Sequence, residues 1–202
     1  WDEQAWWDPH SEEGFVANSP KIDVEAVKKT YNPVNIVVEN FESYRADFES
    51  HAEKFEKNYH VKRNIISMFY KCGRGIELMN EYTARTGKQY DLVIRMRPDL
   101  VFMKHLPDFD INKFYTILHR NHVGLGTGDM FQVSNQWLMS LYGNISLILP
   151  QLYKKTDILC PHIILEQFFK ELNLPWEEFP MEKKLMHTPH GEYVPKQVYG
   201  YN

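Results

Sequence analysis

The residues best suited to chemistry in this sequence stand at alternate positions: Arg95, Arg97 and Asp99. They lie in the stretch YDLVIRMRPDLVF, which otherwise has the apolar composition of a strand. Alternate residues of a strand project to the same face, so the three side chains start out aligned. A guanidinium binds phosphate through paired hydrogen bonds, and a carboxylate binds a divalent metal. An Arg–Asp ion pair on a helix-covered face of a sheet explains the same pattern equally well.

A helix is predicted ahead of this strand. Apolar residues recur at helical spacing over residues 65–82, and Gly87 is placed to end the helix. Beside the apolar face, Asn64, Ser67 and Lys71 form a polar stripe at positions i, i+3 and i+7. A solvated helix face explains this stripe without any function, although the helix leads directly into the arginine-bearing strand.

Two further groups of polar residues follow the strand. The stretch GLGTGD places Asp129 at the end of a glycine-rich loop, where a carboxylate could act as a general base. A flexible turn is the simpler interpretation, since the stretch lacks the G-x-G-x-x-G pattern. His187 and His190 stand near Glu192, and imidazole and carboxylate are suitable ligands for metals such as Mn²⁺. The spacing matches no strict zinc motif, so a surface loop explains this cluster as well.

The elements that must position these residues alternate between strand and helix. The predicted helices cover residues 24–31, 43–60, 65–82, 136–149 and 161–172, with Ser134 as the cap of the fourth. The predicted strands cover residues 34–39, 91–102, 114–118 and 129–133, with a break at Pro98 and a further short strand after Pro175. This alternation predicts a single α/β domain over residues 1–202, with a mainly parallel sheet flanked by helices.

The composition argues against some classes of function. Hydrophobic residues make up 43% of the chain and charged residues 25%, which is typical of a folded domain. The net charge of −4 argues against a nucleic-acid partner, because proteins that grip phosphates are usually basic. The two cysteines, Cys72 and Cys160, form no disulfide framework, which favours a reducing, cytoplasmic location. No apolar run approaches the roughly 20 residues of a membrane span, so none is predicted.

The order of these motifs resembles the small GT-A-type glycosyltransferases of bacterial surface-polysaccharide clusters and of large DNA viruses of algae. The resemblance covers about residues 58–172. It is carried by YDLVIRMRPDLVF, by NIISMFYKCGRGIEL before it, and by GTGDMFQVSNQWLMSLY and CPHIILEQFF after it. The Arg-x-Arg-x-Asp strand with its Tyr-Asp lead is the specific part. The resemblance implies a Rossmann-like GT-A fold in the cytoplasm, which is the host cytoplasm in the viral case.

The resemblance also implies an activity and its partners. The enzyme is expected to move a sugar from a nucleotide-sugar donor, with a UDP-sugar favoured, to a glycan hydroxyl in polysaccharide biosynthesis. The residues that match the family's donor site are Arg95, Arg97, Asn64, Ser67 and Lys71.

A divalent metal, Mn²⁺ or Mg²⁺, belongs to the same expectation. Asp99 takes the place of the family's acidic metal-binding motif, and a late histidine, His190 or His187, completes the metal site. Asp129 matches the acidic position that faces the acceptor. In an inverting reaction, Asp129 is the general base that removes the proton from the acceptor hydroxyl.

Two features depart from the family pattern. The residue after Pro161 is His162, where the family usually has a glutamate. GT-A folds also open with a strand that holds the nucleotide base, and no such strand is visible before Val34. We therefore expect the chain as given to lack this strand.

Two other classes of function explain the sequence. One is a non-catalytic module, a degenerate transferase fold that binds glycan or a partner protein. It predicts that Asp99→Ala leaves function intact and that no metal-dependent nucleotide binding occurs. The other is a metal-dependent hydrolase that uses Asp99, His187 and His190, in which water attacks a phosphoester or glycoside without any nucleotide.

Overall fold

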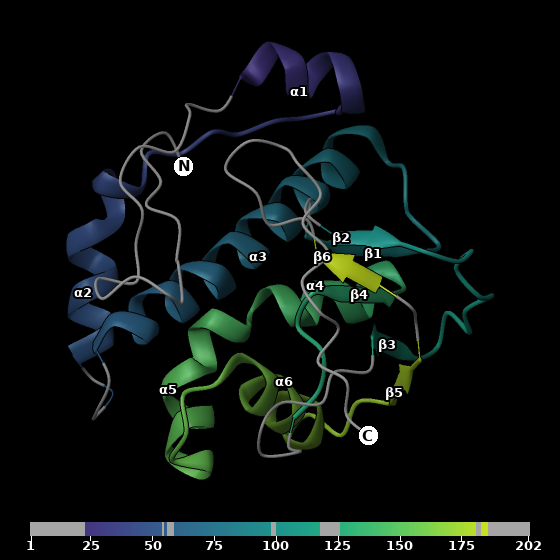
Figure 1. The fold of residues 1–202 in the computed structure, drawn as a ribbon. Helices are drawn as coiled ribbons and strands as arrows, with labels where there is room; N and C mark the ends of the chain where they lie inside the picture. The colour runs from purple at the N-terminus through teal and green to yellow at the C-terminus, as the bar shows by residue number, and fades with distance from the viewer. Residues whose placement is uncertain are drawn as a thin grey trace. The chain divides into compact units, whose positions relative to one another are not determined.

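The computed structural model describes residues 23–53, 55, 59–97, 100–117, 126–180 and 183–185 of the 202-residue chain. The chain forms two compact units, Trp1–His51 and Ala52–Asn202. The first described elements are α1 (Val24–Tyr31), the 3₁₀ helix η1 (Phe41–Tyr44) and α2 (Arg45–Glu53). The second unit contains α3 (Tyr59–Thr86), α4 (Gln136–Gly143), α5 (Ile145–Thr156) and α6 (Pro161–Glu171) (Figure 1). Its strands are β1 (Val93–Met96), β2 (Leu100–Phe102), β3 (Phe114–Ile117), β4 (Phe131–Ser134), β5 (Trp176–Phe179) and β6 (Lys183–Leu185).

Local signals specify α1 but not the strand predicted after it. The Asp23 side chain accepts a hydrogen bond from the Ala26 N–H at 2.9 Å, and the helix ends at Asn32 in the left-handed region (φ 43°). These are ordinary helix caps, and the predicted helix over 24–31 is confirmed. The strand predicted over 34–39 is wrong, because this stretch forms no ladder with any part of the chain that the structure describes. Strand-forming composition alone gives no strand without a partner.

The strands of the second unit form a mixed sheet. The order in the four-stranded sheet is β1-β4-β3-β5, and only the β3–β5 pair is parallel. A separate antiparallel pair joins β2 to β6. The α/β prediction is confirmed, but the mainly parallel arrangement is wrong for the described strands. Three helices follow one another between β4 and β5, so strand and helix do not alternate one by one as in βαβ units.

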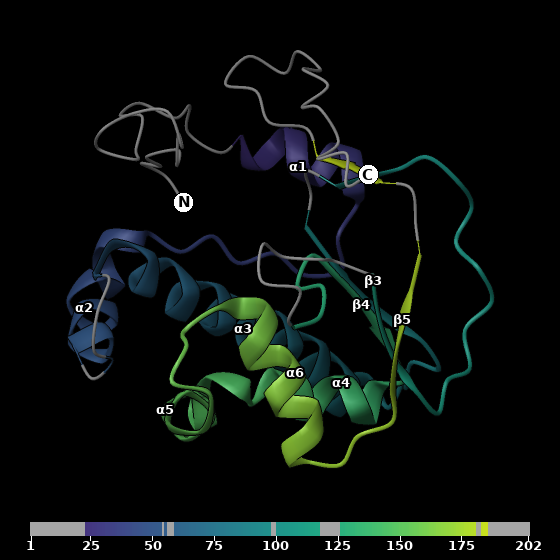
Figure 2. The same ribbon diagram turned by 60° about the horizontal axis from the view of Figure 1, so that its bottom comes forward.

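The helices cover one face of the four-stranded sheet, as Figure 2 shows for α3, α4 and α6. The apolar face predicted for residues 65–82 is confirmed in α3, where Ile65, Phe69 and Ile76 are buried. Gly87 follows this helix with a positive φ of 71°, as its predicted role in ending the helix requires. The opposite face of the sheet carries a second apolar cluster. Its buried members are Leu100, Tyr115, Ile117, Phe131, Val133 and Phe179.

The helix predicted over 136–149 is two helices. Asn144 separates α4 from α5, and Asn135, not Ser134, caps α4 by accepting the N–H of its third residue at 2.9 Å. The Ser134 hydroxyl instead donates to a carbonyl just before β3. Pro150 lies inside α5, where it lacks the N–H that a helix interior requires. Apolar periodicity was continuous across the break, so the pattern did not reveal it.

The stretch YDLVIRMRPDLVF is divided between two sheets. The strand predicted over 91–102 is β1 in the four-stranded sheet and β2 in the two-stranded sheet, with Arg97 between them. Residues 98–99 lie outside the described ranges. The predicted break at Pro98 agrees with this division, since proline has no N–H for a ladder. Two strands, β5 and β6, also replace the single short strand predicted after Pro175.

Candidate functional site

A row of polar side chains crosses the four-stranded sheet on its helix-covered face. Arg95 on β1 lies opposite Gln132 on β4, and Gln132 lies opposite Thr116 on β3. Thr116 in turn lies opposite Glu178 on β5. Directly opposed residues share a face of a sheet, so the row spans all four strands. Gln132 and Thr116 are fully buried, and buried polar groups require hydrogen-bond partners.

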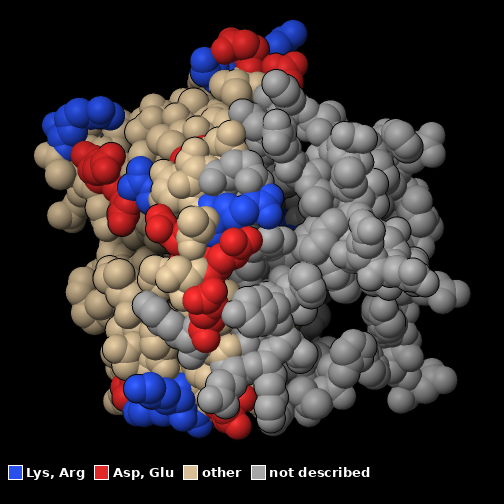
Figure 3. Space-filling view, turned by 90° about the vertical axis from the view of Figure 1, so that its left-hand side faces the viewer, with Lys and Arg blue, Asp and Glu red and all other residues tan. Residues whose placement is uncertain are grey.

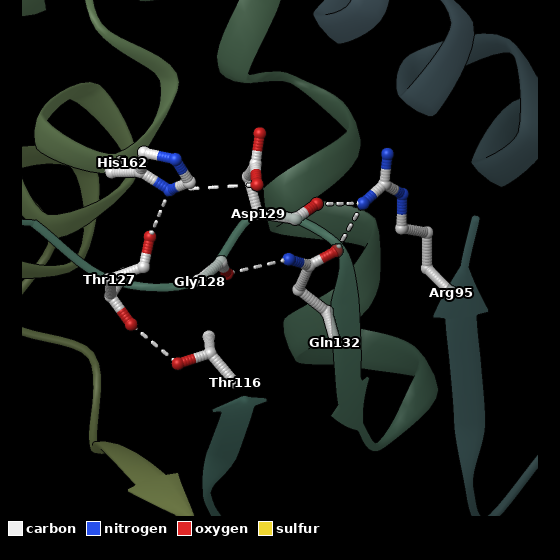
Figure 4. Close-up of polar contacts among 7 residues, drawn as sticks. All are labelled: Arg95, Thr116, Thr127, Gly128, Asp129, Gln132 and His162. Carbon is white, nitrogen blue, oxygen red and sulfur yellow. Dashed lines mark hydrogen bonds and ion pairs between the residues drawn. The ribbon is translucent and has the colours of Figure 1, made fainter. Parts of the chain in front are cut away.

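Arg95 is held by acceptors from the neighbouring strand and loop (Figure 4). Its Nη1 donates to the carbonyl of Asp129 and, at 2.9 Å, to Oε1 of Gln132. The other end of the same amide, Nε2 of Gln132, donates to the carbonyl of Gly128 at 3.0 Å. Gln132 therefore links the arginine to the loop that precedes β4, and both groups of its amide are satisfied.

The helices supply the remaining surroundings of the guanidinium. Burial acts to lower the pKa of Arg95, but Tyr142 on α4, Cys72 on α3 and Asp129 together raise that pKa above its ordinary value. The Tyr142 hydroxyl donates to Sγ of Cys72 at 3.4 Å. Burial, with Cys72 beside it, raises the pKa of Tyr142 well above its ordinary value. The phenol therefore stays protonated at neutral pH, and the arginine remains a half-buried cation.

The loop that ends at Asp129 is fixed to the first turns of α6. The N–H of Gly126 donates to Oε2 of Glu166 at 2.8 Å, and the N–H of Thr127 donates to the carbonyl of His162 at 3.0 Å. Gly126 has a φ of +86° and packs directly on the backbone of His162, where a Cβ would overlap. Only glycine meets both conditions. The hydroxyl of Thr127 is hydrogen-bonded to that of Thr116, which joins the loop to the polar row (Figure 4).

Asp129 and His162 form a carboxylate–imidazole pair at this junction. Nδ1 of His162 lies 3.5 Å from Oδ1 of Asp129, and the two side chains are 16% and 12% exposed, respectively. The same Nδ1 lies 3.0 Å from the carbonyl of Thr127. A carbonyl oxygen only accepts, so Nδ1 carries a proton in this contact. A largely buried carboxylate beside an imidazole is an arrangement that can take up a proton from a bound hydroxyl.

The structure brings only some of the predicted donor residues to this region. Ser67 is fully buried on α3, and its Oγ has no hydrogen-bond partner in the described part of the chain. Lys71 is half-buried, with Nζ 6.0 Å from the centre of the Tyr70 ring. The backbone of Asn64 belongs to α3, and its side chain lies outside the description. The predicted polar stripe therefore turns at least its Ser67 position inward.

Arg97 continues the ladder of β1, because its N–H donates to the carbonyl of Met130 at 3.1 Å. Asp99, His187 and His190 fall outside the described residues, so their assignment to a metal stays a prediction. Within the described ranges, no group of three His, Cys, Asp or Glu side chains could hold a metal ion.

Sequence reasoning missed the residues that build this junction. Gln132, Thr116, Thr127 and Glu166 were not singled out, and His162 was noted only as a departure from the family pattern. One signal was available for Gln132, a polar residue inside an otherwise apolar strand. The contacts of the others depend on strand register and on the packing of α6, which no local pattern encodes.

Two further observations concern the surface charge and the apolar character of the helices. On the face drawn in Figure 3, Lys and Arg side chains lie beside Asp and Glu side chains, without a continuous field of one sign among the coloured residues. Among the residues searched, no helix has the length and apolar character needed to cross a membrane.

Comparisons with protein-family models, with curated proteins and with solved structures give no match. The likeness to glycosyltransferases therefore rests on the sequence motifs alone. The geometry of the polar row and of the Asp129–His162 pair stands independently of that likeness.

Proposed function

We propose that the chain is a glycosyltransferase that moves a sugar from a nucleotide donor, with a UDP-sugar favoured, to a glycan hydroxyl. One observation carries the proposal: the Asp129 carboxylate, the expected base, is largely buried and lies 3.5 Å from the imidazole of His162. An exposed aspartate on a flexible turn would have no such neighbour. The pairing gives the carboxylate a fixed place, from which one of its oxygens can accept the proton of a bound hydroxyl.

The proposed reaction is an inverting transfer. The acceptor hydroxyl oxygen forms a bond to the anomeric carbon as the bond from that carbon to the donor phosphate breaks. The nucleoside diphosphate leaves with the bonding electron pair, and the hydroxyl proton passes to the Asp129 carboxylate. His162 orients the carboxylate through Nδ1, which Thr127 holds in turn.

One further feature supports the proposal. The hydroxyl of Ser67, an expected donor-site residue, is buried without a partner among the described groups, and native interiors rarely leave such a group unpaired. A bound molecule or water would complete its hydrogen bonding. The divalent metal that the resemblance implies would neutralise the leaving diphosphate, with Asp99, His187 and His190 as its expected ligands.

A screen of nucleotides and nucleotide sugars by thermal shift, with and without Mn²⁺, tests donor binding. We expect a uridine nucleotide to raise the melting temperature, and a larger rise when Mn²⁺ is present. A Ser67→Ala variant, which removes the hydroxyl without adding bulk to the buried site, should lose part of that shift. If no nucleotide stabilises the chain with or without the metal, donor binding by this chain is refuted.

A second function, a non-catalytic binding module, is favoured by the bonding of Arg95. The guanidinium is already engaged by the Asp129 carbonyl and by Gln132, so part of its hydrogen-bonding capacity is used inside the fold. A module of this kind would use Arg95 for structure and not for a donor phosphate. It predicts no nucleotide-dependent shift, but a shift with the glycan acceptor alone, so the same screen separates the two functions.

A further inference from the structure

Two buried hydroxyls of the polar row carry one proton more than their hydrogen bond uses. Thr116 and Thr127 are fully buried, and their Oγ1 atoms are hydrogen-bonded to each other (Figure 4). Each hydroxyl has one proton to donate. One of the two protons forms the shared bond, so the other has no acceptor within the described part of the chain. Native interiors rarely leave such a donor unpaired.

A buried acceptor that needs a donor lies beside this pair. Oε1 of Glu178 is buried and has no hydrogen-bond partner among the described residues. Glu178 on β5 lies directly opposite Thr116 on β3, so the two side chains share the helix-covered face of the sheet. The Cβ atoms of such opposed residues are about 5 Å apart, a gap that a hydroxyl and a carboxylate can close directly or through one water.

We infer that Oε1 of Glu178 accepts the hydroxyl proton of Thr116, and that Glu178 is thereby a positioning residue for the proposed base. An ionised carboxylate only accepts hydrogen bonds, so it sets the direction of the bonds that follow. Thr116 donates to Glu178, and Thr127 donates to Thr116. Both hydroxyl protons and the carboxylate oxygen are then satisfied, and the Thr127 hydroxyl is held in one orientation.

The contacts continue from Thr127 to the proposed base. The carbonyl of Thr127 lies 3.0 Å from Nδ1 of His162, and that nitrogen lies 3.5 Å from Oδ1 of Asp129. The N–H of Thr127 also donates to the carbonyl of His162 at 3.0 Å. Holding the side chain of Thr127 therefore limits the movement of the imidazole that orients Asp129. This role of Glu178 rests on the proposed function, since it acts on the base of that reaction.

Thermal denaturation tests the bond between Glu178 and Thr116 without any activity. Glu178→Met removes the acceptor and keeps a side chain of similar length, and Thr116→Val removes the donor. In the parent chain, Glu178→Met should lower the melting temperature by about 2–4 °C more than it does in the Thr116→Val background, where the bond is already lost. Equal changes in the two backgrounds would overturn the inference.

The rate of the proposed transfer tests the positioning role. Glu178→Met should lower kcat about tenfold with KM nearly unchanged, because the base moves while the donor and acceptor still bind. Glu178→Gln keeps an acceptor oxygen and should recover most of that loss. The matched control is Glu177→Met, at the exposed neighbouring position of β5, which should leave kcat unchanged. A parent-like kcat for Glu178→Met, or an equal loss in Glu177→Met, would overturn the positioning role.

Failure of the proposed function gives a different result. A parent chain that releases no nucleoside diphosphate refutes the transfer, while the melting temperatures still decide whether Glu178 bonds to Thr116. The positioning role is then measured by NMR of the ring nitrogens of His162. Their signals should change in Glu178→Met and stay as in the parent in Glu177→Met. Unchanged His162 signals in both variants would overturn the positioning role.

Discussion

The two faces of β1 reverse the usual pattern of a strand. On the helix-covered face, Arg95 is a half-buried cation that bonds to Gln132 and to the carbonyl of Asp129. On the other face, Ile94 and Met96 are apolar and 43% exposed. An ordinary half-buried strand places its apolar residues inside and its charges in water.

This reversal separates two roles within four residues. The inner face joins three strands and the loop of Asp129 through polar contacts, and so it positions the proposed base. The outer face contributes little to that network. Substitutions on the helix-covered face should therefore disturb the position of the proposed base as well as stability, whereas substitutions on the other face should have smaller effects on stability.

The largest loss of stability is expected from Arg95→Met. This change leaves the Asp129 carbonyl and Oε1 of Gln132 without their shared donor in a buried setting, at a cost of about 2–4 kcal/mol in the free energy of unfolding. Urea denaturation followed by circular dichroism measures this free energy. Adding Gln132→Leu should cost less than the sum of the two single changes, because both partners are then apolar. A strictly additive double variant would show that the two residues do not act together.

A loss of about 2–3 kcal/mol is expected from Gly126→Ala. The added Cβ meets the backbone of His162, and the positive φ strains any residue other than glycine. Gly87→Ala is the matched control, since Gly87 also has a positive φ but no atom within 4 Å of an added Cβ. The control should cost only about 1 kcal/mol. Equal losses in thermal or urea denaturation would contradict the close fit of the loop on α6.

The outer face should tolerate change better than the cluster that it continues. Ile94→Thr should cost less than about 1 kcal/mol in the free energy of unfolding, measured at low protein concentration. Val133, directly opposite on the same face, is fully buried, and Val133→Thr buries a hydroxyl at a cost of about 1–3 kcal/mol. A larger loss from Ile94→Thr than from Val133→Thr would mean that the edge is covered in the monomer.

The smallest effect is expected at the surface pair of Glu171 and Lys155, whose Oε2 and Nζ lie 2.5 Å apart. The hydrogen bond from Lys155 lowers the pKa of Glu171, so its contribution to stability is present above the unfolded-state pKa and is lost as the pH falls through the folded-state value. Calorimetry of Glu171→Gln should show a slightly lower melting temperature near neutral pH. The difference should shrink as the pH falls through the folded-state pKa of Glu171 and vanish below that pKa. A difference that grows in acid would contradict this sign.

Local sequence signals predicted several of the helices, but not the division of the helix predicted over 43–60 into η1, α2 and the start of α3. The apolar spacing over 65–82 and Gly87 each act within a few residues of the element that they define. Such signals can be read from one stretch of chain without knowing its neighbours. They failed at Asn144, where the apolar spacing runs through the break between α4 and α5.

The sequence alone could not predict the contacts between segments that lie far apart in the chain. Arg95 was identified as a residue for chemistry, but its bonding to Gln132 depends on the register of β1 on β4. The stretch 34–39 has strand composition and forms no ladder in the described structure. His162 gained its interest only when α6 was seen to place it beside Asp129. Each of these features depends on strand pairing or on helix packing, which a local sequence pattern does not predict.

The most direct test of the proposed function is the rate of nucleoside diphosphate release from a nucleotide sugar, with a glycan acceptor present. Asp129→Asn keeps the shape of the side chain but removes the base, and it should lower kcat/KM about 10²- to 10⁴-fold with the melting temperature nearly unchanged. Asp108→Asn, at an exposed position, should match the parent chain. Equal rates for Asp129→Asn and the parent would contradict the assignment of Asp129 as the base, and with it the proposed mechanism.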